Sequence, residues 1–250
     1  MWWNLHRYLR PFHVTDCLAC RKVLAAPKVM CDLCAIECIP WPIDFCMRCG
    51  APMIHARCCK EPSDGSQSRL HISWLYEGSI ARSIRETKNG HSISRTAAFV
   101  PLIFQNHPDE AFFNGLDLVI PVPPNPSRLK RAGFDLVTEV SAFVAKALSL
   151  PLKHRWLIRT RKDGQKGQSR QERKQNALGL YRIAKGHRDL TGKSVLLMDD
   201  VRTTGATTDT ISELLMAAGC SDVRIWAIAG QATSRSEATQ IEPYPSRPKA

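Results

Sequence analysis

The stretch SVLLMDDVRTTGATTDTISELL, Ser194–Leu215, decides the fold class that we expect for this chain. It begins with a short apolar run, passes through two acidic residues into a turn rich in Thr and Gly, and continues with apolar residues at helical spacing. This pattern predicts a buried strand over Ser194–Met198 and a helix over Thr207–Ala218. In open parallel sheets ligands bind beyond the carboxyl ends of the strands, so we expect a ligand at this turn.

The chemistry of the turn favours a phosphate group. Backbone N–H groups and Thr hydroxyls can surround the phosphate, Gly205 permits a tight turn, and the following helix N-terminus favours an anion. Asp199 and Asp200 would repel a phosphate, and paired carboxylates suit the adjacent hydroxyls of a sugar instead. The alternative is that the acids and threonines only cap the loop and the helix. The predicted phosphate-binding residues are Val201, Arg202, Thr203, Thr204, Gly205, Ala206 and Thr207.

Elements on both sides of this stretch complete an α/β pattern. Leu116–Pro123 is an apolar run that ends in prolines, as a buried parallel strand would. Leu136–Leu148 has the apolar spacing of a helix, and Val223–Ala229 is a further expected strand. Gly219 is a candidate stop for the helix over Thr207–Ala218. Strand, helix and strand at this spacing predict a parallel crossover unit. We therefore expect a parallel-sheet, Rossmann-like α/β domain.

Cysteine usage indicates metal near the start of the chain. Of the 10 cysteines, all except Cys220 lie between Cys17 and Cys59. A cytosolic chain cannot rely on disulfides, and each CxxC turn places two thiolates on one small knuckle. Two knuckles complete a tetrahedral Zn²⁺ site, and we expect the first such site to be formed by Cys17, Cys20, Cys31 and Cys34.

The ligands of a second zinc site are less well defined by the sequence. Cys46 and Cys49 need two partners, and His55 and Cys58 repeat the two-residue gap. Cys59 could replace either His55 or Cys58. The four knuckles could also pair in an interleaved order. Cys38 has no obvious partner ligand. The spacing reserves no open coordination position, so we expect both metals to be structural. We expect Cys220 to be a buried or helix-end residue without a metal.

Composition narrows the class of partner. The chain has 250 residues, 44% of them hydrophobic, and a formal charge of +12, which favours anionic partners such as phosphates, nucleotides or nucleic acid. No run approaches the length of a membrane helix, and residues 1–13 lack the features of a signal peptide, so we expect a cytoplasmic protein. The segment Arg159–Lys174 holds seven basic residues and two acidic ones, and it is either a loop that closes over pyrophosphate or a solvated charged loop.

Val195–Thr208 resembles the motif with which type I phosphoribosyltransferases bind phosphoribosyl pyrophosphate (PRPP). The resemblance implies that Asp199 and Asp200, the candidate catalytic residues, contact the ribose 2′ and 3′ hydroxyls, and that Thr203–Thr207 hold the 5′-phosphate. It also implies Mg²⁺ bridging the pyrophosphate and ribose oxygens. Some members of this group bind PRPP or nucleotides only as regulators.

The cysteine-rich and α/β parts together resemble the ComF family, a double zinc ribbon followed by a phosphoribosyltransferase domain. YEGSIARSIRETK, Tyr76–Lys88, resembles the family stretch from a Tyr to a Lys ahead of the first helix. Further matching positions lie in LVIPVPPNPSRLKRAGFD and RTRKDGQKGQSRQERKQNALGLY: Pro121, Val122, Pro123, Arg131, Gly133, Phe134, Arg159, Thr160, Gln168, Arg173 and Asn176. The chain departs from the family in having Asp135 and Leu136 in place of Asn-Gln, and HARCC in place of the last CxxC.

These patterns divide the chain into a lead-in (1–16), a double zinc ribbon (17–60), a linker (61–69), a phosphoribosyltransferase-like domain (70–230) and a disordered tail (231–250). The pyrophosphate candidates are Lys88, Arg131, Lys162 and Arg173. Three functions stay open: a Mg-dependent phosphoribosyltransferase, a PRPP sensor without turnover, and a zinc-ribbon DNA-binding factor. The resemblance implies a combined role in which PRPP binding is linked to natural competence, with single-stranded DNA and recombination proteins as partners.

Overall fold

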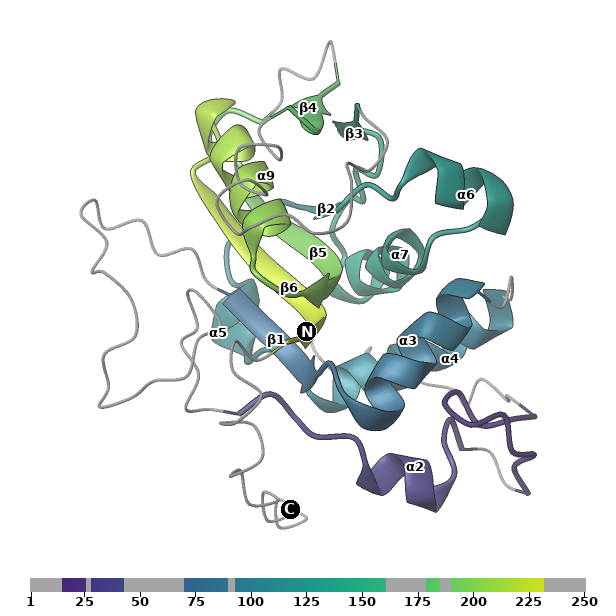
Figure 1. The fold of residues 1–250 in the computed structure, drawn as a ribbon. Coiled ribbons are helices and arrows are strands. Elements are labelled where there is room, and N and C mark those ends of the chain that lie inside the picture. The colour runs from purple at the N-terminus through teal and green to yellow at the C-terminus, as the bar shows by residue number, and fades with distance from the viewer. Residues whose placement is uncertain are drawn as a thin grey trace.

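A four-stranded parallel sheet forms the centre of the molecule in the computed structural model, which describes residues 15–25, 28–42, 70–89, 93–160, 179–184 and 190–231 (Figure 1). The strand order is β1-β6-β5-β2, with β1 at Leu70–Leu75, β2 at Leu118–Pro121, β5 at Ser194–Arg202 and β6 at Asp222–Gly230. All three pairings are parallel, which confirms the expected α/β class.

The helices connect these strands and cover both faces of the sheet, so that the fold has three layers (Figure 1). Between β1 and β2 lie α3 (Gly78–Asn89), α4 (Ile93–Gln105) and α5 (Glu110–Phe113). After β2 come α6 (Pro126–Ala132), α7 (Leu136–Leu148) and a small antiparallel pair, β3 (Leu157–Arg159) and β4 (Tyr181–Ile183). Helix α9 (Ala206–Ala217) joins β5 to β6 as the expected crossover.

The uninterrupted apolar run of β5 reflects burial of both faces of this strand. Side chains alternate between the two faces of a strand. Leu196 and Met198 accordingly pack in the core beneath α3, α4 and α7, whereas Val195 and Leu197 pack in the core beneath α9. Both faces are buried, which is the usual situation of a central parallel strand.

The structure confirms the expected elements and changes some of their bounds. Helix α7 has the expected bounds, and Gly219 follows α9 with a positive φ of 97°. Strand β5 runs four residues beyond the expected Met198, because it stays paired with β6 as far as Arg202 and Gly230. The stretch that ends at Lys88 is itself a helix, α3, so Lys88 lies in the last turn of that helix.

The cysteine-containing segment packs against the open edge of the sheet at β1. Leu75 N–H donates to the carbonyl of Ile39 at 2.9 Å, and Trp41 N–H donates to the carbonyl of Ser73 at 3.1 Å. A Cβ at Gly230 would lie 2.5 Å from the ring of Trp41, so a residue without a side chain is needed there. These contacts cover an edge whose backbone groups would otherwise be unpaired.

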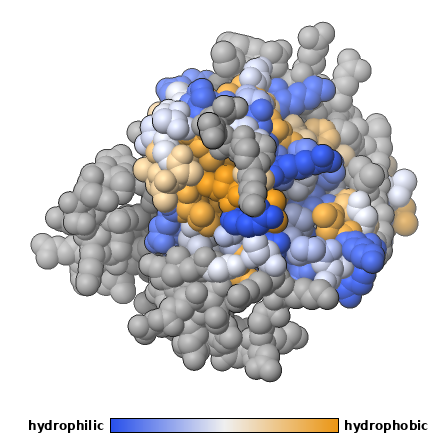
Figure 2. All heavy atoms as spheres, turned by 90° about the horizontal axis from the view of Figure 1, so that it is seen from above, coloured by the Kyte–Doolittle hydropathy of each residue, from blue (hydrophilic) through white to orange (hydrophobic). Residues whose placement is uncertain are grey.

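Viewed from above, the described surface has a central hydrophobic area bordered by hydrophilic residues (Figure 2). None of the helices in the described ranges has both the length and the apolar character that crossing a membrane requires.

Candidate functional site

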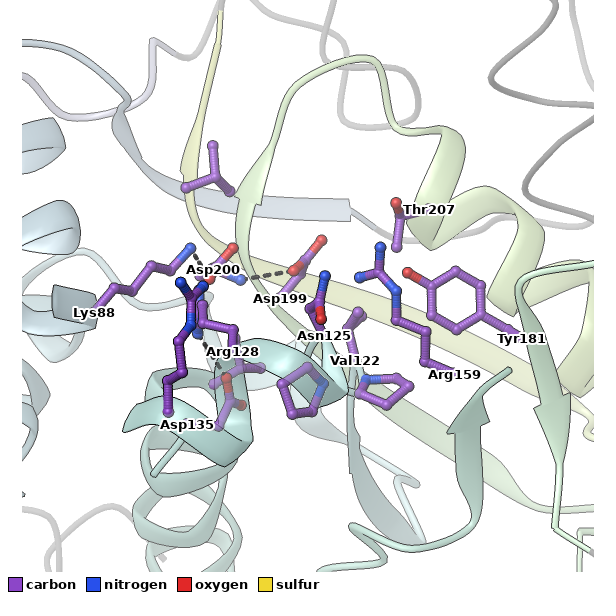
Figure 3. A pocket seen from close by; sticks show the side chains of 15 residues that line it. Lys88, Val122, Asn125, Arg128, Asp135, Arg159, Tyr181, Asp199, Asp200 and Thr207 are labelled. Atoms are coloured by element: carbon purple, nitrogen blue, oxygen red, sulfur yellow. Dashed lines mark hydrogen bonds and ion pairs between the residues drawn. The ribbon is translucent and has the colours of Figure 1, made fainter. Parts of the chain in front are cut away.

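A cavity of about 400 Å³ lies at the carboxyl ends of β2 and β5, where the sequence predicts a ligand (Figure 3). Its floor comes from Val122 and Pro123 after β2, and from Asp199 and Asp200 near the end of β5. The walls carry four basic residues, from α3, α6 and β3, which are Lys88, Arg128, Arg131 and Arg159. A cavity with this many cations around two adjacent carboxyl groups suits a ligand that has both anionic groups and hydroxyls.

The two carboxyl groups of β5 lie in different environments. Asp199 is 8% exposed, and its burial, with the neighbouring Asp200 charge as a smaller cause, raises the pKa of Asp199 to about 8. Its carboxyl oxygen accepts the N–H of Asp200 at 2.8 Å. Asp200 points the other way and forms an ion pair with Lys88 of α3. Burial thus favours the neutral form of Asp199, whereas the Asp200 carboxylate is paired with the Lys88 ammonium.

The turn between β5 and α9 has the predicted tight geometry. Gly205 is the residue before the first helical turn, and its φ of 80° is in the left-handed region that favours glycine. Arg202 lies beneath the turn, 4% exposed, where its guanidinium donates to the hydroxyl of Thr208 and, at 3.1 Å, to Asp209. The Arg202 side chain thus supports the turn from inside the fold, whereas Val201 before the turn and Thr207 after it line the cavity.

Helix α6, which the sequence analysis did not predict, forms one wall of the cavity. Asn125 caps α6 by accepting the N–H of Ser127 at 2.9 Å. Arg128 of this helix donates to Asp135 at 2.9 Å, and the same carboxylate accepts the N–H of Thr138 at 2.9 Å as the N-cap of α7. The burial of Asp135 raises its pKa, and these donors act in the opposite direction.

Arg159 and Tyr181 form the side of the cavity toward Thr207, opposite Lys88 (Figure 3). They are paired residues of the β3–β4 ribbon, and the guanidinium carbon of Arg159 lies 5.8 Å from the centre of the Tyr181 ring. Such a cation–π contact restricts the orientation of the guanidinium. Arg159 matched a family position in the sequence, but nothing in the pattern indicated that Tyr181, 22 residues later, lies beside it.

The structure brings several predicted site residues to one cavity. Lining residues among them are Lys88, Arg131, Asp199, Asp200, Val201 and Thr207, while Thr203, Thr204, Gly205 and Ala206 form the adjacent turn and first helical residue. Five further polar lining residues were not predicted as ligands: Asn125, Arg128, Asp135, Arg159 and Tyr181. The pyrophosphate candidates Lys162 and Arg173 lie outside the described residues.

A second candidate site is formed by the cysteines of the two knuckles. The sulfur atoms of Cys17, Cys20, Cys31 and Cys34 all lie within 4.8 Å of one another, and Cys20 and Cys31 are 3.8 Å apart. A tetrahedron with metal–sulfur distances of about 2.3 Å has edges of about 3.8 Å, so the cluster is of the right size for a metal ion such as zinc.

The knuckles have the local structure that their spacing predicts. In the first, the N–H of Arg21 donates to the carbonyl of Cys17 at 3.1 Å, and the positive φ of Arg21, 66°, reverses the chain. In the second, Cys31 precedes α2 (Asp32–Ile36), whose first turn carries Cys34. Cys38 lies outside the four-sulfur cluster, and its thiol donates to the carbonyl of Cys34 at 3.3 Å.

The residues of the predicted second metal site lie outside the part of the chain that the structure describes. They are Cys46, Cys49, His55 and Cys58, together with the alternative ligand Cys59. Cys220 follows α9 and is buried, as expected. Among the described residues it is the only cysteine in the hydrophobic core beneath α9.

Comparison with known proteins identifies relatives over most of the chain, although no family model matches it. It is 26% identical to competence protein F of Haemophilus influenzae over 223 residues, which is 85% of this chain and 96% of the relative. The chain is thus similar to competence protein F over most of its length. A DNA utilization protein YhgH of Salmonella typhimurium matches 85% of this chain and 95% of its own length, also at 26% identity. The YhgH of Escherichia coli O6:H1 is 27% identical over 226 residues.

Comparison with solved structures matches part of the chain to phosphoribosyltransferases at low TM-scores. The match to a purine phosphoribosyltransferase from Pyrococcus horikoshii covers 59% of this chain and 78% of that one, at 17% identity and a TM-score of 0.37. A glutamine PRPP amidotransferase from B. subtilis covers 52% of this chain and 25% of its own, at 23% identity and a TM-score of 0.34. The α/β class itself rests on the strand order described above.

Proposed function

We propose that the cavity at the ends of β2 and β5 binds PRPP. One observation carries the proposal: the carboxyl groups of Asp199 and Asp200 lie directly before the tight turn at Gly205, with basic residues of other elements on the facing walls. A ligand with adjacent sugar hydroxyls and two separate phosphate groups matches this division of charge.

Each part of the ligand has a proposed partner. The ribose hydroxyls hydrogen-bond to Asp199 and Asp200, and the 5′-phosphate binds the N–H groups of the turn from Val201 to Thr207 at the start of α9. The diphosphate binds Arg128, Arg131 and Lys88, joined by Lys162 and Arg173 of the basic segment. Mg²⁺ accompanies the ligand and neutralises part of the diphosphate charge.

The proposal includes two structural parts. Residues 17–60 form a unit that holds Zn²⁺ through Cys17, Cys20, Cys31 and Cys34, with a second zinc bound by Cys46, Cys49, His55 and Cys58. Residues 61–69 link this unit to a phosphoribosyltransferase-like domain over 70–230, and residues 231–250 form a tail. In a cytoplasmic setting this protein links PRPP binding to the handling of internalised single-stranded DNA, as the names of its relatives suggest.

Calorimetric titration of the metal-loaded chain with PRPP and Mg²⁺ tests the proposal. Asp200→Asn removes the charge but keeps the shape, and we expect it to weaken PRPP binding at least tenfold, which is about 1.4 kcal/mol. Asp117→Asn is the matched control, because Asp117 accepts the Ser194 N–H and pairs with Lys193 away from the cavity. Absence of PRPP binding to the native chain, or equal losses in both variants, contradicts the proposal.

Turnover separates an enzyme from a sensor. In a transferase, an acceptor nucleophile bonds to ribose C1 while the bond from C1 to the pyrophosphate oxygen breaks, so pyrophosphate is released. A sensor binds PRPP and releases none. Screening acceptors for pyrophosphate release therefore decides between the two, with Asp200→Asn as the inactive reference.

A DNA-binding role is favoured by the charge of +12 and by the relatives named for DNA utilization. Because phosphate contacts release counterions, the affinity for a single-stranded oligonucleotide should fall steeply as salt rises. Fluorescence anisotropy across a salt series measures this. A flat salt dependence, or no binding at low salt, excludes the role.

A further inference from the structure

The ion pair between Lys88 and Asp200 occupies the carboxylate that the proposed ribose site requires. Lys88 comes from the last turn of α3 and Asp200 from β5, and the two side chains are 19% and 16% exposed. Figure 3 shows the Lys88 ammonium directed at Asp200. In the free protein, then, the carboxylate is already bound by a cation of the chain itself.

Separating such a pair leaves two unpaired charges on side chains that are mostly buried. An unpaired, partly desolvated charge is costly, so each partner needs a replacement when the contact breaks. Ribose hydroxyls can donate to the released carboxylate. The ammonium needs an anion, and the long flexible stem of lysine allows it to move to one within the same cavity.

We propose that Lys88 is an exchange residue: it neutralises Asp200 in the free protein and transfers to the diphosphate of PRPP when the ribose hydroxyls take over Asp200. The inference rests on the proposed function and deepens it, because it makes recognition of the sugar depend on the presence of the diphosphate. Ribose 5-phosphate frees Asp200 from Lys88 but provides no diphosphate to receive the ammonium. PRPP provides both, and the site thus discriminates between a phosphoribosyl donor and its hydrolysis product.

Amine acylation of the native chain tests the exchange. A water-soluble acetyl N-hydroxysuccinimide ester labels lysines according to their availability, and mass spectrometry reads each site. We expect labelling of Lys88 to rise about three- to tenfold with saturating ribose 5-phosphate, corresponding to loss of one partly exposed ion pair, and to return to the free level or below with PRPP. Lys193, paired with Asp117 outside the cavity, is the internal reference and should stay constant.

A pair of variants provides a second measurement. Lys88→Met should lower the affinity for PRPP about tenfold, because a charged contact to the diphosphate is lost, whereas Lys193→Met should leave it unchanged. The affinity of Lys88→Met for ribose 5-phosphate should not fall, because the free variant has no ion pair for that ligand to break.

The outcomes separate this inference from the function on which it rests. If the native chain does not bind PRPP, the proposed function fails. If it binds PRPP and Lys88 labelling is the same in all three states, or Lys88→Met binds PRPP as the native chain does, the exchange is wrong and the PRPP site stands. Labelling that stays high with PRPP also overturns the transfer to the diphosphate.

Discussion

Asp199 is a carboxyl group that the fold buries beside a second one. Its pKa is raised to about 8 by burial and, to a smaller extent, by the charge of Asp200, whereas in the unfolded chain it titrates near the ordinary value of 3.8. Between these two values the folded state holds a proton that the unfolded state has released. The contribution of Asp199 to the free energy of unfolding therefore falls as pH rises from about 4 to about 8.

We expect Asp199→Asn to remove this dependence. The variant should lose less stability than the native chain between pH 5 and pH 8, and the difference between the two should grow as pH rises. Urea unfolding of both proteins across this range measures the difference. His71, whose pKa burial lowers to about 4, affects both proteins equally and so cancels in the comparison. Parallel pH profiles would show that Asp199 has no raised pKa.

Asp135 has two structural roles that can be separated by substitution. It caps α7 by accepting the N–H of Thr138, and it pairs with Arg128 at the cavity wall. Asparagine remains a good N-cap but lacks the charge, whereas alanine loses both roles.

We expect Asp135→Ala to lower the free energy of unfolding by about 1–3 kcal/mol, and Asp135→Asn to lower it by less, since the cap survives. Both should weaken PRPP binding, because Arg128 loses the partner that orients it. Urea unfolding and calorimetry read the two effects separately. Equal destabilisation by both substitutions would show that the ion pair, and not the cap, carries the stability.

At the scale of elements, the turn between β5 and α9 depends on glycine for two reasons. Gly205 has a φ of 80°, and a Cβ there would overlap the guanidinium of the buried Arg202. Gly115 has a similar φ of 74° with no atom within 4 Å of a Cβ, so only the backbone strain applies there.

Gly205→Ala should therefore destabilise the protein by about 2–4 kcal/mol, and Gly115→Ala by about 1 kcal/mol. Because the turn must shift to relieve the overlap, only Gly205→Ala should also weaken PRPP binding. Thermal unfolding and calorimetry on the two variants provide the comparison. An equal loss of stability in both variants would mean that the Arg202 side chain moves away from the new methyl group at no energetic cost.

At the scale of the whole molecule, the knuckle segment is part of the same core as the α/β layers. Cys17, Leu18 and Cys34 pack with Ile80 and Ile84 of α3. The buried Arg95 of α4 donates to Asp16 at 2.5 Å and to the carbonyl of Leu18 at 2.7 Å. Loss of the metal should consequently destabilise the sheet and its helices together with the knuckles.

We expect Cys20→Ser to remove one equivalent of zinc and to lower the melting temperature of the whole chain. Cys38→Ser is the control, since Cys38 lies outside the four-sulfur cluster, and it should keep its metal. Elemental analysis gives the zinc content and calorimetric scanning the melting temperature. Full zinc content in Cys20→Ser, or loss in Cys38→Ser, would show that the ligand set is different.

Residues close together in the chain were predictable. The apolar run, acidic pair and glycine turn of Ser194–Leu215 predicted a buried strand, a tight turn and a helix, and the CxxC spacing predicted the cluster of four cysteines. Both patterns are local, so hydrogen bonding along a helix, pairing of a buried strand and the reach of a short knuckle are enough to determine them. The same locality explains why α7 has the expected bounds.

Residues far apart in the chain needed the tertiary structure. Lys88 meets Asp200 because the sheet order puts α3 beside the carboxyl end of β5, and Tyr181 meets Arg159 because β3 and β4 pair across a long connection. The length of β5 was likewise underestimated, since its last residues are strand only through hydrogen bonds to β6. By itself the sequence determined the α/β class, the tight turn after β5 and the cluster of four cysteines. Only the tertiary structure decided which distant cations face the acidic pair, because those contacts depend on crossovers and packing that no local pattern records.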